Sequence, residues 1–233
     1  MKWTLITGGA IRLGAEIARE LAKSGYNIVI HFNKSKTPAQ KLKNDIKKIG
    51  VHCEIISGDF NSSSSVQDFL NRYDFDTENL IHNMGNFLIE GPLETSIDNW
   101  ENLFQTNLFA PVQITKELVP QIIKHKGRIV TIGVTGINTA RADIKSTAYT
   151  QTKTSLLGFT KALAVELAPR GVTVNMVSPG QLDNSIDLKD PSKLPMKRAG
   201  KTRDVARMIK FLLEPESNYI TGQNIEVAGA LRL

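Results

Sequence analysis

The sequence predicts an α/β fold: a doubly wound, seven-stranded parallel sheet with helices on both faces. Short apolar runs alternate with amphipathic helical stretches from one end of the 233-residue chain to the other. Several of these runs are apolar at consecutive positions, as strands buried on both faces must be. The first run leads directly into Thr7-Gly8-Gly9, where glycine lets the chain turn sharply before a helix. These three observations together indicate a sheet built from strand–helix units.

Strands and helices alternate in the expected order, with right-handed crossovers between parallel neighbours. Strands are predicted at residues 3–6, 27–32, 51–57, 79–82, 128–132, 173–177 and 224–227. Helices are predicted near residues 14–24, 38–49, 63–72, 99–124, 150–168 and 203–213. The serines 62–65 indicate a helix N-cap region rather than a linker. Nothing else resembles a domain boundary, so we expect one domain over residues 1–233.

The composition suits a globular protein outside membranes. Hydrophobic residues make up 41% of the chain, enough for a sizeable core, and no apolar run is long enough to span a bilayer. Residues 1–6 have the pattern of a buried strand rather than a signal peptide. The single Cys53 cannot form an internal disulfide, and its place in an expected strand indicates a small buried hydrophobe. We therefore expect a cytoplasmic protein with no membrane partner.

The net charge of +6 does not by itself indicate a nucleic-acid partner. The basic residues are scattered over helix faces, such as Lys41 and Lys43, with no aromatic-interleaved stripe beside them. A solvated face is the simpler interpretation, and we expect no nucleic-acid binding. A positive field would favour a phosphorylated cofactor or an acidic partner.

The turn after the first strand has the pattern of a pyrophosphate site. Gly8, Gly9 and Gly14 let the backbone approach the phosphates, and the N–H groups at the start of the following helix attract the anion. Ligands of open parallel sheets bind beyond the C-terminal ends of the strands, so residues at those ends are the binding candidates. The turn therefore predicts a dinucleotide cofactor.

The end of the second strand decides which dinucleotide is favoured. An acidic residue there would bind the ribose 2′-hydroxyl and repel a 2′-phosphate. The sequence instead runs Asn33-Lys34-Ser35 with no acid. Lys34, Ser35 and Arg12 can converge on a dianionic phosphate through charge-assisted hydrogen bonds. We therefore expect NADPH rather than NADH.

Tyr149 and Lys153 lie one helical turn apart, and hence on one face of an expected helix. A tyrosine hydroxyl, with a pKa of about 10, exchanges protons poorly at neutral pH unless a cation stabilises the phenolate. Lys153 can supply that cation. The pair therefore indicates a proton donor for the reduction of a carbonyl by hydride.

Three features carry a family resemblance: the glycine turn, the Tyr149/Lys153 pair and the downstream residues 173–180. Together they resemble the short-chain dehydrogenase/reductase family over nearly the whole chain. The resemblance implies a Rossmann-type, NADP-binding domain and an oxidoreductase. It implies that Tyr149 is the general acid/base, that Lys153 lowers its pKa and holds the nicotinamide ribose, and that Asn107 binds a water near the lysine.

The resemblance also assigns cofactor contacts at the remaining strand ends. Asp59, followed by Phe60, would lie against the adenine, although Asp59 also suits the N-cap of the next helix. Asn83 and Gly85 would pass close to the ribose and the nicotinamide, whereas His82 departs from the family pattern and indicates a hydrogen-bonded structural residue. No metal site is expected. The expected cofactor contacts are Gly8, Arg12, Leu13, Gly14, Asn33, Lys34, Ser35, Asp59, Phe60, Asn83, Gly85, Lys153, Pro179 and Gly180.

The serine that the family uses beside the tyrosine is missing. In residues 132–136, after the fifth strand, the closest alignment puts Val134 at the serine position. A shift of one residue offers Thr135, whose hydroxyl could orient a substrate oxygen as serine does. The register stays open, and Thr135 is the fourth catalytic candidate beside Tyr149, Lys153 and Asn107.

Two enzymatic branches match the sequence. Arg12 in the glycine turn and residues 82–87 look like pteridine reductases and dihydromonapterin reductases, with Phe87 where an aromatic stacks on the pterin. Residues 127–133 and 195–198 look like 3-oxoacyl-acyl-carrier-protein reductases, and a basic protein suits an acidic carrier. We expect reduction of a carbonyl or imine in a small substrate, with a pterin and a 3-oxoacyl thioester as candidates.

A rival class and a mode of assembly also follow from the sequence. With the serine missing, the chain could be an NADP-binding module with little catalysis, acting as a sensor or scaffold. The segment of about residues 181–202 corresponds to the family's substrate lid. It is short and polar, which argues against a large apolar substrate. The helical patterns at 99–124 and 150–168 carry broad apolar arcs, and in the family they pair to form a homotetramer or homodimer.

Overall fold

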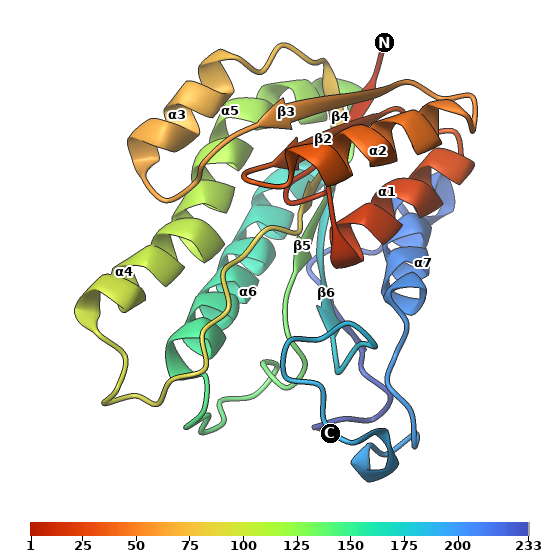
Figure 1. The fold of residues 1–233 in the computed structure, drawn as a ribbon. Helices are drawn as coiled ribbons and strands as arrows, with labels where there is room; N and C mark the ends of the chain where they lie inside the picture. The colour runs from red at the N-terminus through yellow and green to blue at the C-terminus, as the bar shows by residue number, and fades with distance from the viewer. Residues whose placement is uncertain (233) are drawn as a thin grey trace.

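The computed structural model describes residues 1–232, which fold into a doubly wound sheet with helices around it (Figure 1). Within these residues the sheet has seven parallel strands in the order β3-β2-β1-β4-β5-β6-β7. The prediction of a seven-stranded parallel sheet is confirmed. The strands are β1 (Trp3–Ile6), β2 (Ile28–Phe32), β3 (Cys53–Ser57), β4 (Thr77–His82), β5 (Arg128–Ile132), β6 (Thr173–Pro179) and β7 (Asn224–Val227).

Helices cover both faces of the sheet, as the consecutive apolar runs of the strands require. One core is formed with α1, α2 and α7, and the other with α3, α5 and α6 (Figure 1). The helices are α1 (Arg12–Lys23), α2 (Lys36–Lys47), α3 (Ser63–Asn71), α4 (Ile97–Phe104), α5 (Ala110–His125), α6 (Thr147–Leu167) and α7 (Thr202–Leu213).

The sheet changes its direction of growth beside β1. The chain adds β2 and β3 on one side of β1, then crosses over to add β4 and the remaining strands on the other side. In open α/β sheets this switch point is where ligands bind, beyond the C-terminal ends of the strands. The glycine turn after β1 and the segment after β4 therefore meet at the expected binding position.

The expected helix over residues 99–124 is interrupted by a π-helical turn. The turn η1 (Gln105–Phe109) lies between α4 and α5, and it contains the fully buried Asn107. An extra residue in one turn rotates the following residues, and such turns occur frequently at functional sites. Hydrophobic periodicity did not predict this irregularity, because a single widened turn barely shifts the apolar pattern.

The helix α3 begins at a serine N-cap and not at Asp59. Ser62 accepts a hydrogen bond from the Ser65 backbone N–H at 3.1 Å, and the Ser65 hydroxyl lies 3.2 Å from the Ser62 nitrogen. This capping box confirms the serine-rich N-cap. Asp59 instead accepts from the Asn33 side chain and the Asn61 backbone, so the alternative that Asp59 is the helix cap is wrong.

Cys53 and His82 are both buried in the structure, as structural rather than reactive residues. Cys53 is buried, and burial raises the pKa of its thiol to about 12, so the thiol is not reactive at neutral pH. His82 is buried with its Nε2 2.8 Å from the Thr115 hydroxyl, and burial lowers its pKa to about 3. None of the helices in residues 1–232 is long and apolar enough to cross a membrane.

Candidate active site

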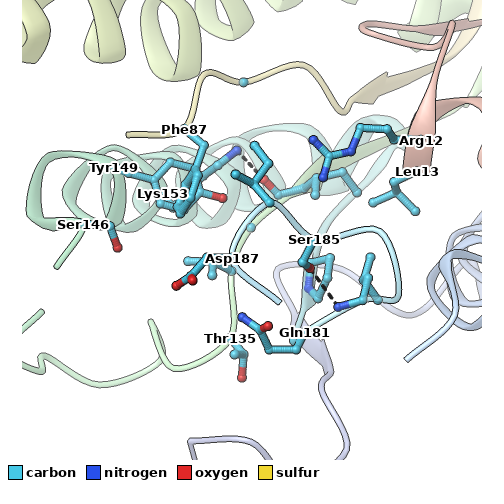
Figure 2. Close-up of a pocket in the computed structure, with 18 of the residues that line it drawn as sticks. Arg12, Leu13, Phe87, Thr135, Ser146, Tyr149, Lys153, Gln181, Ser185 and Asp187 are labelled. Carbon is cyan, nitrogen blue, oxygen red and sulfur yellow. Dashed lines mark hydrogen bonds between the residues drawn. The ribbon is translucent and has the colours of Figure 1, made fainter. Parts of the chain in front are cut away.

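A cleft of about 500 Å³ lies at the C-terminal ends of the central strands. Its walls come from the glycine turn, the loop after β4, the loop before α6 and the loop after β6. Arg12 and Leu13 lie at one end of the cleft, and Phe87, Tyr149 and Lys153 lie at the other (Figure 2). The fold therefore brings residues separated by more than 130 positions in the sequence into one site.

Glycine is required at two positions of the turn after β1. Gly8 has a φ of +62°, and a Cβ on Gly14 would lie 2.2 Å from the Gly8 carbonyl oxygen. The Asn83 side chain donates hydrogen bonds to the carbonyl oxygens of Thr7 and Gly8, at 3.1 and 2.9 Å, and so joins the turn to the end of β4. No side chain caps the start of α1 at Arg12, so its first N–H groups can receive an anion.

Arg12 occupies the place where the family carries a further glycine. Its φ of +53° is the left-handed conformation that glycine adopts most easily, which explains the family's preference. The Arg12 guanidinium donates a hydrogen bond from Nη2 to the carbonyl oxygen of Asn184. Arg12 therefore connects the glycine turn with the loop that follows β6.

His31, in β2, supports the glycine turn from the sheet. The Gly8 N–H donates to His31 Nδ1 at 3.1 Å, and His31 Nε2 donates to the Gly58 carbonyl oxygen at 3.1 Å. Both contacts need a neutral ring, and burial lowers the pKa of His31 to about 4. Phe60 stacks on this ring with centroids 4.1 Å apart. The Phe60 ring is thus part of the core and does not line the cleft.

The β2–α2 turn keeps the polar groups that the sequence assigned to a phosphate. Lys34 is exposed, and Ser35 precedes α2 without using its hydroxyl as a cap. Asn33 donates to Asp59 Oδ1 at 3.3 Å, which joins the turns after β2 and β3. The Lys34 ammonium and the Ser35 hydroxyl therefore stay available for an anion.

Tyr149, Phe87 and Lys153 form a compact cluster. The rings of Phe87 and Tyr149 meet edge to face with centroids 4.8 Å apart. Lys153 Nζ donates to the Ile132 carbonyl oxygen at 2.9 Å and lies 5.7 Å from the centre of the Tyr149 ring. Burial lowers the pKa of Lys153 to about 8.

Burial raises the pKa of Tyr149 to about 12, so the lowered value that the sequence predicted is wrong for this arrangement. Burial is the cause, although Lys153 Nζ, which is hydrogen-bonded to the backbone of β5, lies over the tyrosine ring. A hydroxyl with this pKa carries its proton throughout the neutral range, as a proton donor must.

Asn107 is buried behind this cluster. Its Oδ1 accepts from the Asn86 N–H at 2.7 Å, and its Nδ2 donates to the Asn86 carbonyl oxygen and to the Thr152 hydroxyl. Gly85 makes room for the arrangement, because a Cβ there would lie 3.1 Å from Asn107 Oδ1 and 3.2 Å from Lys153 Nζ. Asn107 thus fixes the loop after β4 against the helix that carries Tyr149 and Lys153.

Thr135 is placed differently from the catalytic role expected for it. Its hydroxyl lies 2.7 Å from Glu226 Oε2 and 2.9 Å from the Leu231 carbonyl oxygen, two acceptors that engage its single proton. It is 3% exposed and lies apart from Tyr149 (Figure 2). Val134, the other candidate for the family's serine position, lines the cleft but has no hydroxyl. Neither Thr135 nor Val134 therefore offers a free hydroxyl to the tyrosine.

Pro179 ends β6 and Gly180 follows it, and both line the cleft, where we expect cofactor contacts. The Gly180 N–H donates to the Val227 carbonyl oxygen at 3.1 Å, and a Cβ on Gly180 would lie 2.8 Å from the Ala228 Cα. Glycine at this position therefore lets the segment after β7 approach the cleft.

Sequence reasoning missed two sets of cleft residues. Asp143 accepts hydrogen bonds from the Ser146 backbone and from the side chains of Ser146 and Thr150, and it anchors the start of α6. Burial acts to raise its pKa, but these hydrogen bonds hold the pKa of Asp143 below the usual range. An aspartate three residues before the N-cap residue of a helix was a local signal for this anchor. Leu231 and Arg232 also line the cleft, and nothing local in the sequence indicates it.

The residues of the cleft fit a dinucleotide. The turn excludes a side chain at Gly14, exposes the N-terminus of α1 and leads along one surface to Lys153 and Pro179. Residues 1–232 contain no cluster of three or more His, Cys, Asp or Glu side chains suited to a metal ion. Fold and cleft together define a dinucleotide-binding α/β oxidoreductase.

Comparisons with known proteins identify the family. The family model described as enoyl-(acyl carrier protein) reductase matches residues 9–231. The chain is 31% identical over 241 residues to the 3-oxoacyl-[acyl-carrier-protein] reductase FabG of Staphylococcus epidermidis, covering 99% of this chain and 98% of that one. It is 33% identical to FabG of Buchnera aphidicola from Schizaphis graminum, covering 99% and 97%. The protein belongs to the short-chain dehydrogenase/reductase family.

Solved structures agree with this assignment. A blue fluorescent protein from a metagenomic library, in complex with NADPH, matches with a TM-score of 0.90 and 29% identity, covering 98% of this chain and 96% of that one. A short-chain dehydrogenase/reductase from Serratia marcescens matches with a TM-score of 0.91 and 25% identity, covering 100% and 98%. The match extends over the whole sheet and both helical layers.

Proposed function

We propose that the protein is an NADPH-dependent reductase that acts on a carbonyl or imine group of a small substrate, with Tyr149 as the proton donor. The observation that carries the proposal is the cluster of Phe87, Tyr149 and Lys153 at one end of the dinucleotide cleft. The bound cofactor supplies the hydride. Tyr149 supplies the proton that the developing alkoxide or amine requires.

The chain's own residues suit this division of work. Tyr149 is protonated at neutral pH because burial raises its pKa. Lys153, on the same helix face, is the nearby cation for the phenolate that remains, and we assign it the nicotinamide ribose as well. Asn107 holds the loop after β4 beside the lysine, and we assign it the water of a proton relay. Residues 181–202 are proposed to act as the substrate lid, linked to the cofactor turn by Arg12.

Two substrate classes have support. The relatives named 3-oxoacyl-[acyl-carrier-protein] reductase favour a 3-oxoacyl thioester, with an acyl carrier protein as partner. The partly exposed Phe87, set edge to face against Tyr149, favours a flat heterocycle such as a pterin. Because stacking matters for a planar ring and hardly for a flexible thioester, Phe87→Ala should selectively impair pterin reduction.

The test is the oxidation of NADPH, followed by its absorbance, with dihydropteridines, acetoacetyl thioesters and small ketones and quinones. Turnover of any one of them supports the reductase. Tight NADPH binding without turnover on the whole panel would contradict it, and would favour a binding module that acts as a sensor or scaffold.

Cofactor choice gives a first prediction. NADPH should bind at least tenfold tighter than NADH, a difference of ~1.4 kcal/mol, because we assign the 2′-phosphate to Arg12, Lys34 and Ser35, and residues 33–36 contain no acid. Lys34→Asp should abolish or reverse the preference. Fluorescence titration of both cofactors measures it. Lys48→Asp, at the far end of α2, is the control and should change neither affinity. Equal affinities in the wild type would refute the choice of cofactor.

Assembly gives a second prediction. Phe109, in η1, and Val165, in α6, are apolar and exposed at 54% and 78%. We propose that the surfaces around Phe109 and Val165 pair with a second copy of the chain, giving a homodimer or homotetramer. We also propose that the protein works in the cytoplasm, where Cys53 stays reduced. Light scattering at micromolar concentration should report two or four times the 25.7 kDa of one chain. A mass of one chain for the wild type would exclude both assemblies.

A further inference from the structure

The segment after β7, Ala228–Arg232, contributes Leu231 and Arg232 to one wall of the cleft. On one side the Cβ position of Gly229 lies 3.1 Å from the Met196 sulfur, in the loop after β6. On the other side the Cβ position of Gly136 lies 3.0 Å from the Arg232 Cδ, in the loop before α6. The segment therefore lies between the proposed lid and the loop that leads to Tyr149.

Glu226 fixes this wall from the end of β7. Its carboxylate accepts from the Thr135 hydroxyl at 2.7 Å, from the Gly136 N–H at 2.9 Å and from the Asn138 side chain at 3.3 Å. The Leu231 carbonyl oxygen lies 2.9 Å from the same Thr135 hydroxyl. Such a set of charge-assisted contacts holds the loop and the segment in one position. Thr135 is thus explained as part of this wall.

Arg232 brings a guanidinium to the cleft. Arg141 donates to the Arg232 carbonyl oxygen at 2.9 Å, and the side chain crosses Gly136 to reach Asp143, with Nη1 3.9 Å from Oδ2. Asp143 already accepts four closer hydrogen bonds, two from backbone N–H groups and two from the Ser146 and Thr150 hydroxyls. Within residues 1–232 the guanidinium has no closer acidic neighbour, so its fork of donors is available to a ligand.

The charges around the cleft favour a negative ligand. The cations Lys145, Lys189 and Arg232 line it beyond those assigned to the cofactor, against the carboxylates of Asp143 and Asp187. Asp143, Tyr149 and Thr150 all line the cleft, and Arg232 lies 3.9 Å from Asp143, so we place Arg232 on the substrate side of the cleft. A guanidinium in a cleft wall recognises carboxylate or phosphate through two parallel hydrogen bonds.

We propose that Arg232 is the specificity residue for an anionic group on the substrate, a carboxylate or a phosphate. This inference rests on the proposed reductase and names the substrate class of that same site. Glu226 and Thr135 are positioning residues, since they hold the segment that carries Arg232. The carbonyl compound is then bound at two ends, by Tyr149 at its oxygen and by Arg232 at its charge.

Two matched pairs of probes test the inference and separate the sources of the anion. Acetoacetate and ethyl acetoacetate differ in a carboxylate near the ketone, and acetoacetyl-phosphopantetheine and acetoacetyl-pantetheine differ in a phosphate on the arm. Arg232→Ala should raise the KM of the favoured anionic probe roughly tenfold or more, because charge-assisted hydrogen bonds contribute free energies in that range. The KM of the matched neutral probe should change less than about twofold. Arg232→Lys should restore part of the loss. Arg170→Ala, in an exposed turn, is the control.

Binding gives a readout that does not depend on turnover. NADPH affinity should be the same in Arg232→Ala and the wild type. In Tyr149→Phe protein loaded with NADPH, one anion should bind more tightly than its neutral partner, and adding Arg232→Ala should remove that difference. Two results would overturn the inference while leaving the proposed reductase activity intact. The first is that Tyr149→Phe protein binds both members of each pair equally well. The second is that Arg232→Ala weakens the binding of neutral and anionic probes equally. If the probes bind but none of them is reduced, the result would count against the proposed reductase activity and not against the anion site.

Discussion

Replacing Tyr149 by phenylalanine is expected to lower reductase turnover by about 10³-fold while NADPH affinity stays within about twofold of the wild type. Tyr149 carries the hydroxyl of the Phe87, Tyr149 and Lys153 cluster, and general acid catalysis contributes about 10²–10⁴-fold. The substitution keeps the ring, so the edge-to-face contact with Phe87 and the Lys153 bond to Ile132 remain. Stopped-flow or steady-state NADPH oxidation measures turnover, and cofactor fluorescence measures affinity.

Tyr219→Phe is the matched control for this substitution. Tyr219 is 97% exposed and does not line the cleft, so loss of its hydroxyl should leave turnover unchanged. A Tyr149→Phe protein with more than about a tenth of the wild-type rate would show that the proton comes from another group or from water. A parallel loss of NADPH affinity would point instead to damage at the cofactor site.

The fold follows from features that the sequence shows directly. Runs such as residues 28–32 and 128–132 are buried at every position, and such predominantly apolar runs predict central strands. The helix N-cap at Ser62 likewise has a local signal, in the serines that follow it. The π-helical turn at Asn107 has none, because its register depends on the contacts that Asn107 makes with Asn86 and Thr152.

The site was predictable where function imposes a local pattern. Gly14, Tyr149 and Lys153 follow from spacing within a few residues of the turn and of the helix, whereas Asn83 follows from the resemblance of its segment to the family. Thr135 was misjudged because the acceptor of its hydroxyl, Glu226, lies 91 positions further along the chain. Hydrogen bonds of that range depend on the completed sheet, in which β5, β6 and β7 are neighbours. The lowered pKa expected for Tyr149 failed for a related reason, since burial is also a property of the whole fold.

The second large effect is expected from a side chain at Gly14, in the glycine turn after β1. A Cβ on Gly14 would lie 2.2 Å from the Gly8 carbonyl oxygen, 2.7 Å from Asn83 Nδ2 and 2.9 Å from the Gly9 Cα. Two of these atoms belong to the backbone, which cannot yield as the end of a flexible side chain does. The Asn83 side chain would also lose its hydrogen bonds to Thr7 and Gly8, which join the turn to β4. The surface that receives the pyrophosphate would therefore be displaced.

We expect Gly14→Ala to weaken NADPH binding by at least tenfold and to lower the free energy of unfolding by roughly 1–3 kcal/mol, as overpacking of a tight site does. Cofactor titration and urea unfolding measure the two effects. Gly158→Ala is the matched control: Gly158 lies in α6 with nothing within 4 Å of its Cβ position, and alanine favours a helix by roughly 0.5–1 kcal/mol. That variant should bind NADPH normally and be slightly more stable. A Gly14→Ala protein with wild-type affinity would show that the nucleotide does not approach this turn.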